Sequence, residues 1–249
     1  AVNRNLRPSI VAKYARDMAA DKWDLNGEAI ILAQDGTLLN GQHRLHACVK
    51  TDAPFWSLIC IGVPLSAMKN LDTGEKRSFA DRLRLEGVEH HHKQHGALVA
   101  LFHEYLYTRS AGYPSREELS ATNAKYFAEI AEAVDFAVSC RIHGVPMPLN
   151  MSSCCLTFLL FRRCAVKPAE EYISQCIAGE GISRTDAAWS VRAKVQRARE
   201  QGQQVTPKDQ IALLIRGWNA VRSQRSFSKA YARGKGPDAK NWRTLPVHK

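Results

Sequence analysis

The sequence predicts an α+β fold, in which a small mixed sheet with helices is followed by an all-α part. Residues 28–40 form two apolar strand-like segments around an Asp-Gly turn, and residues 54–63 form a third. From Ala97 onward, apolar residues recur at helical spacing between capping signals. We therefore expect a mixed α/β domain over residues 1–90, a helical domain over residues 96–221 and a basic tail over residues 222–249.

The first helix is predicted to follow Ser9, whose hydroxyl can cap it. It should run from Ile10 to Ala20, because Ile10, Tyr14 and Met18 make an apolar stripe at helical spacing. We expect this stripe to pack on the sheet. A polar Asp-Leu-Asn-Gly loop then leads into the first strand.

Residues 28–50 are the stretch on which the prediction of function depends. They open with an apolar segment that predicts a buried strand, turn at an Asp-Gly pair and start a second strand. That strand should end at Gly41. A helix is predicted to begin at once, because Leu45, Cys48 and Val49 recur at helical spacing.

Gly41 at the start of this helix predicts an anion site. Glycine lets the backbone approach a ligand without a Cβ in the way, and the first amide groups of a helix lack intrahelical acceptors. Gln42, His43 and Arg44 add side-chain donors in the same turn, and a planar guanidinium suits phosphate oxygens. The alternative interpretation is that Gly41 only shapes a turn and the polar side chains are solvated.

The segment NGQHRLHA, from Asn40 to Ala47, resembles the Asp-Gly-Gln-His-Arg-Leu-x-Ala box of phage ParB-like nuclease domain proteins. These belong to the ParB/sulfiredoxin superfamily. The resemblance covers about the first 90 residues and implies a nucleotide-binding domain whose box holds phosphates. Gln42 replaces the catalytic cysteine of sulfiredoxins, so sulfinic acid reduction is not expected. Asn40 replaces the acidic residue of free serine kinases of this fold, which leaves the general base open.

The resemblance also implies that the segment after the third strand completes the nucleotide site. Asp72 could then bind the metal or act as a base, Arg77 and Arg4 could contact phosphate, and Glu28 is a second candidate base. The alternative is that Asp72 or the serine after Arg77 caps a helix and Arg77 is solvated.

Signals in the helical half predict where its helices begin. Ser115 and Glu118 form a capping box, Asn150 or Ser152 can cap a nearly all-apolar helix, and Pro207 suits the start of the last long helix. Before these, the EHHHKQH segment offers two histidines at helical spacing for a metal. No third ligand is apparent there, which favours a polar linker or a helix start.

Composition bounds the partners of the chain. A net charge of +11 and a pI near 9.5 favour a polyanion, and nucleic acid before membrane. No apolar run approaches the roughly 20 residues of a membrane span, and the amino-terminal segment lacks a secretory pattern, so a cytoplasmic protein is expected, in the host cytoplasm if phage-encoded. The seven cysteines contain no Cys-x-x-Cys pair and should be small buried residues.

The predicted tail combines basic residues with aromatic ones. Such a mixture can neutralise phosphates and stack on unpaired bases, although a tail that its aromatics anchor on its own domain is the alternative. The candidate nucleic-acid contacts are Arg222, Arg225, Lys229, Arg233, Lys235 and Arg243.

The predicted function is transfer of a phosphoryl group from ATP or another nucleoside triphosphate, with Mg²⁺, to a hydroxyl of nucleic acid. A hydroxymethylated base in phage DNA is one such acceptor. His43 and Arg44 would neutralise charge, while Asp72 or Glu28 would hold the metal or take the proton. The alternatives are a nucleotide-gated DNA-binding protein of the ParB type and a nuclease. The sequence does not predict the oligomeric state.

Overall fold

The computed structural model describes residues 5–71, 78–107, 114–224 and 227. The chain divides into two compact units. Unit 1 comprises Ala1–Ser78 with Tyr107–Ala121, and unit 2 comprises Phe79–Leu106 with Thr122–Lys249.

Unit 1 contains a small sheet of three strands in the order β2-β1-β3. β1 pairs antiparallel with β2 and parallel with β3, so the sheet is mixed, as the sequence predicts. The elements are α1 (Pro8–Ala19), β1 (Ile30–Ala33), β2 (Leu38–Asn40), α2 (Gln42–Thr51), β3 (Ile59–Val63) and the 3-10 helix η1 (Leu65–Asn70).

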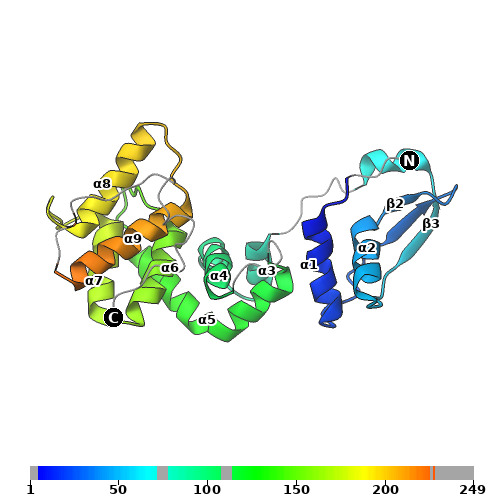
Figure 1. Cartoon of the computed structure of the whole chain (residues 1–249), viewed down its shortest axis with the longest axis horizontal. Helices are drawn as coiled ribbons and strands as arrows, with labels where there is room; N and C mark the ends of the chain where they lie inside the picture. The colour runs from blue at the N-terminus through cyan, green and yellow to red at the C-terminus, as the bar shows by residue number, and fades with distance from the viewer. Residues whose placement is uncertain (1–4, 72–77, 108–113, 225–226, 228–249) are drawn as a thin grey trace. The chain divides into compact units, whose positions relative to one another are not determined.

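The core of unit 1 lies between its two helices, and Figure 1 shows α2 between α1 and the sheet. Val11, Ala15 and Met18 of α1 are buried together with Ala47 of α2. α1 therefore packs on α2 rather than on the sheet, contrary to the prediction. It also begins one residue before Ser9, at a proline that has the fixed φ of a first helical position and needs no hydroxyl cap.

After Val63, the described residues form helices and no strand. Those that contribute to unit 2 are α3 (Phe79–Leu85), α4 (His92–Leu106), α5 (Arg116–Ser139), α6 (Met151–Arg162), α7 (Val166–Ala178), α8 (Ala187–Glu200) and α9 (Pro207–Arg222). The first residues of α5 belong to unit 1.

α6 is the centre of unit 2, and ten of its residues are buried. Its Phe161 stacks on Trp218 of α9 with ring centroids 4.6 Å apart. The side chain of Asn150 caps α6 by accepting a hydrogen bond from the Ser152 amide, as predicted. Pro207 is likewise the first residue of α9, behind a capping box made by Thr206 and Asp209.

The predicted capping box of α5 is also present. The backbone N–H of Ser115 donates to the Glu118 carboxylate at 2.6 Å, and the Glu118 N–H donates to the Ser115 hydroxyl at 3.1 Å. α4 begins within the histidine-rich segment, and its His95 is buried with Nε2 2.7 Å from Oδ1 of Asn123. The described residues contain no group of three or more potential metal ligands.

Two further predictions concern membranes and thiols. None of the helices in the described part of the chain has both the length and the hydropathy of a transmembrane span. All seven cysteines are free thiols; Cys154, Cys155 and Cys176 are buried, as expected, whereas Cys60 on β3 is exposed. Burial raises the pKa of Cys155 to about 12, which keeps this thiol protonated at neutral pH.

Candidate functional site

Several of the predicted residues meet at one end of the sheet in unit 1. Asn40 pairs with Ile31, and Ile30 pairs with Ile59, so the chain leaves β2 beside the residues that precede β1 and β3. We call this group the amino-end cluster, and its members are Glu28, Gly41, Gln42, His43, Arg44 and Ser57.

Gly41 joins β2 to α2 in the left-handed region, with φ of 107°. A side chain there would be strained, and a Cβ would collide with Cδ1 of Ile30. The left-handed backbone therefore favours glycine here whether or not a ligand approaches, whereas the contact with Ile30 involves only the end of a flexible side chain. The amide groups of Arg44 and Leu45 donate to the Gly41 carbonyl, both at 3.0 Å, so the helix begins immediately after this residue.

Arg44 is buried, with 7% of its surface exposed. Its guanidinium donates to the Glu28 carbonyl and, at 2.8 Å, to the carbonyl of Ala29. These bonds fasten the first turn of α2 to the start of β1. These two bonds use two of the five N–H donors of the guanidinium, so the predicted phosphate contact by Arg44 does not require either of them to be given up.

His43 contacts the start of α1. Its Nε2 accepts a hydrogen bond from the backbone N–H of Arg7 at 3.1 Å. An acceptor nitrogen carries no proton, so the ring is held as the neutral tautomer with its hydrogen on Nδ1. Any donation from His43 to a phosphate must come from Nδ1 while this bond is kept.

Glu28 is exposed, and its backbone carbonyl also accepts from the Ser57 hydroxyl at 3.2 Å. The contacts that place Glu28 in the cluster are those of its backbone carbonyl, and its role as a base stays a prediction. The other predicted residues, Arg4, Asp72 and Arg77, lie outside the described residues. The structure therefore does not describe Asp72, the residue predicted to bind the metal.

The first turn of α2 has an electrostatic character that suits an anion. Gly41 has no side chain to cap the helix, and the turn contains no acidic residue. The amino end of a helix behaves as a partial positive charge of about half an elementary unit. Phosphate is the common guest of such a position when it follows a strand through a glycine.

Two members of this region were not predicted. Arg7 supplies the amide that orients His43, and Ser57 binds the same carbonyl as Arg44. A signal for Arg7 does exist, because the residue before a proline at a helix start is extended, and its amide lies outside the helix. Nothing in the sequence around Ser57 distinguishes it from any other serine before a strand.

Of the predicted nucleic-acid contacts, only Arg222 lies within the described residues. It is the last residue of α9, and its guanidinium carbon lies 5.7 Å from the centroid of the Trp218 ring. The other five predicted contacts lie outside the described residues: Arg225, Lys229, Arg233, Lys235 and Arg243.

Comparisons with known proteins return no match for this chain among protein-family models, curated proteins or solved structures.

Proposed function

We propose that unit 1 is a ParB/sulfiredoxin-like domain whose amino-end cluster binds the phosphates of a nucleoside triphosphate. The observation that carries the proposal is the start of α2, which leaves the sheet through a left-handed glycine and has no acidic residue in its first turn. The mixed sheet and the order of its elements support the same domain type.

We further propose that the protein transfers the terminal phosphoryl group to a hydroxyl of nucleic acid. The bond between the terminal phosphorus and its bridging oxygen breaks, a bond from that phosphorus to the hydroxyl oxygen forms, and a carboxylate takes the hydroxyl proton. Glu28 is the carboxylate that the described residues offer in the cluster, and Asp72 is the second candidate. ATP with Mg²⁺ is the proposed donor, and DNA with a hydroxymethylated base is one proposed acceptor.

The residues around the start of α2 would have distinct parts in this reaction. The first-turn amides and Gln42 would contact phosphate oxygens, and Nδ1 of His43 would donate as well while Nε2 keeps its bond from Arg7. Arg44 would position the start of α2, because its bonds to the carbonyls before β1 hold that end of the helix against the sheet. Mg²⁺, when bound, would neutralise charge on the transferred group.

A reaction with γ-labelled ATP, Mg²⁺ and plain or hydroxymethylated DNA tests the chemistry. Label on the DNA is the expected result. Cleaved DNA without label would make the protein a nuclease, and nucleotide binding without either product would make it a nucleotide-gated DNA-binding protein.

Gln42→Glu tests the binding site more sharply than a larger residue at Gly41, which would also disturb packing on Ile30. A carboxylate in the first turn favours the helix dipole, so stability should be unchanged or slightly higher. It also repels phosphate, so nucleotide affinity should fall at least about tenfold, or about 1.4 kcal/mol. Calorimetric titration with ATP and thermal unfolding measure the two effects.

The matched control is Gln94→Glu, which places the same charge in the first turn of α4 in unit 2. It should leave nucleotide affinity unchanged. If Gln42→Glu binds ATP as tightly as the wild type does, phosphates are bound elsewhere and the proposed site is wrong.

A further inference from the structure

Charge is distributed unevenly along unit 2. Its residues before Arg184 include eight lysines and arginines against ten acidic residues. Residues 184–222, which contain α8 and α9, have eight basic residues against three acidic ones. The basic residues are Arg184, Arg192, Lys194, Arg197, Arg199, Lys208, Arg216 and Arg222. Positive charge is therefore concentrated in these two helices, which pack against each other.

The three acidic residues of this segment are bound to local polar groups. The Asp186 carboxylate accepts from the Ser183 amide at 2.6 Å, immediately before α8. Asp209 accepts from the Thr206 amide at 2.9 Å in the capping box of α9. The Asp209 carboxylate thus belongs to the cap of α9, and the Asp186 carboxylate binds the turn before α8 without capping that helix.

The third acid, Glu200, accepts a hydrogen bond from the Gln196 amide group at 3.0 Å. It is the last residue of α8 and is exposed. None of the three carboxylates forms an ion pair with Arg197 or Arg199 among the described residues.

Elsewhere in unit 2, arginines do pair with acids, and within residues 184–222 Lys208 of α9 pairs with Glu104 of α4 at 2.7 Å. Arg163 of α6 lies 2.6 Å from the Glu129 carboxylate of α5, and Arg162 pairs with Glu132 one turn along the same helix. The excess of charge on α8 is therefore a local feature and not the general condition of this surface.

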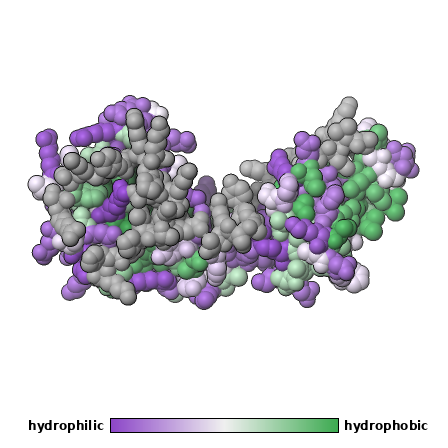
Figure 2. Space-filling view, in the orientation of Figure 1, coloured by the Kyte–Doolittle hydropathy of each residue, from purple (hydrophilic) through white to green (hydrophobic). Residues whose placement is uncertain are grey.

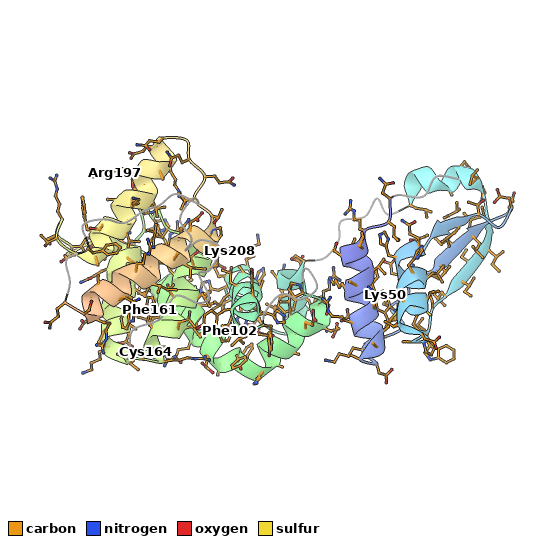
Figure 3. All side chains as sticks on the ribbon, in the orientation of Figure 1. Lys50, Phe102, Phe161, Cys164, Arg197 and Lys208 are labelled. Carbon is orange, nitrogen blue, oxygen red and sulfur yellow. The ribbon has the colours of Figure 1, made fainter. Side chains whose placement is uncertain are left out.

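The cations of α8 fall into two groups. Arg192 is structural, because its guanidinium donates to the carbonyls of Cys176, Ile177 and Pro146 at 2.7 to 2.9 Å. By contrast, Arg197 and Arg199 are exposed, and Figure 3 labels Arg197 on this helix.

Lys194 lies near Arg197 and adds to the positive potential of the helix. Burial lowers the pKa of Lys194, and the positive charge of Arg197 lowers it further. Two like charges are thus held close together on one side of α8. A polyanion would relieve this repulsion, which costs stability in the protein alone.

We propose that the exposed side of α8 binds the phosphate backbone of nucleic acid, with Arg197 and Arg199 as its contacts. A lipid surface fits less well, because the outward residues Gln196 and Glu200 give the helix no apolar face to insert. The inference assigns a surface in unit 2 that is separate in sequence from the amino-end cluster, and it holds whether or not the cluster binds nucleotide. If the proposed phosphotransfer is correct, α8 is the surface that holds the acceptor.

The test is DNA binding by the full chain, measured by fluorescence anisotropy with a duplex of about 20 base pairs between about 50 and 200 mM salt. The variant Arg197→Gln/Arg199→Gln should bind at least about tenfold more weakly at the low-salt end. Its plot of log affinity against log salt should be shallower by about 0.9 for each phosphate that the variant no longer neutralises. Arg197→Lys/Arg199→Lys keeps both charges and should retain most of the slope.

Arg82→Gln/Arg84→Gln is the matched control, because it removes the same charge from α3 in the same unit, where Arg82 is paired with Glu86. It should leave the slope nearly unchanged. Equal losses in the two double variants would show a response to net charge alone and overturn the proposal. The proposal would also be overturned if Arg197→Gln/Arg199→Gln bound DNA as tightly as the wild type does, or if the protein bound anionic vesicles more tightly than DNA. ATP titration of the same variants shows separately whether the nucleotide site is intact, so a failed DNA-binding proposal can be told apart from a failed nucleotide site.

Discussion

The guanidinium of Arg44 joins the first turn of α2 to the two residues that precede β1. The sequence predicted a phosphate ligand here, from the residue type and its place near a helix start. Gly41, Arg44 and Ala47 are three residues apart and all are buried, but no apolar stripe marks this face of α2 in the sequence. The carbonyl acceptors could not be predicted either, since they precede a strand whose position depends on the whole sheet.

Replacing this side chain tests its structural role. Arg44→Met should lower the free energy of unfolding of the protein without ligand by about 3 kcal/mol, because hydrogen bonds from charged groups are worth roughly 1.5 to 3 kcal/mol each. Urea unfolding at neutral pH measures the change. A residue that served only to bind phosphate would leave the stability of the protein without ligand unaltered.

His95 is a second buried group that the sequence only partly predicted. His91 and His95 were considered as a metal pair, but the lack of a third ligand favoured a linker or a helix start. In the structure, the His95 side chain joins α4 to Asn123 of α5. Burial lowers the pKa of His95, and the bond to Asn123 and the charge of Asp135 only partly oppose this. The folded protein therefore favours the neutral ring.

This shift predicts how stability depends on pH. An unfolded histidine binds a proton as pH falls through about 6.5, whereas His95 in the folded protein binds its proton only at a lower pH. The unfolded state then binds more protons, so stability should fall as pH drops below about 6.5 and level off once the folded ring is also protonated. The fall between pH 7 and pH 5.5 should be smaller in His95→Gln, measured by urea unfolding. An equal fall in both proteins would assign it to other groups.

At the scale of elements, helix starts were the most predictable feature. The capping box of Ser115 and Glu118 and the cap at Asn150 depend on residues within three positions of one another, so the sequence contains the whole interaction. The buried face of α2 was less predictable. Leu45 and Val49 indicated the helix correctly, yet both are exposed, Val49 by 83%.

β3 is an edge strand with an unusual surface. Ile59 and Ile61 are 66% and 73% exposed, and Figure 2 shows an apolar surface over this part of unit 1. Apolar composition predicted the strand itself correctly, although it begins at Ile59 rather than at residue 54. Composition alone does not predict burial, because an edge position depends on which strands pair.

Burial predicts a contrast between two apolar residues of the same size. Ile61→Ser should change the free energy of unfolding by less than about 0.5 kcal/mol, since its side chain already meets water. Leu83→Ala in α3 should cost about 2 to 5 kcal/mol, because Leu83 is 0% exposed. Denaturant unfolding compares them, and a large cost at Ile61 would mean that a partner covers β3 in solution.

At the scale of the whole molecule, the α+β class followed from short apolar strand-like segments and from apolar residues at helical spacing, whereas the mixed pairing of the sheet was implied by the resemblance to the ParB/sulfiredoxin superfamily. The division into units did not follow from sequence order. Tyr107–Ala121 belongs with unit 1, although unit 2 residues lie on both sides of it in the chain. Contacts between segments far apart in sequence decide such a division, and periodicity contains no information about them.

The claim on which the account depends is that phosphate groups bind where α2 leaves the sheet. The most direct measurement is an amide NMR titration of the full chain with ATP and Mg²⁺. We predict that the largest shift changes occur at the amides of Gln42 and His43, with small changes in α8. Saturable changes confined to other residues, or none at millimolar ATP, would contradict it.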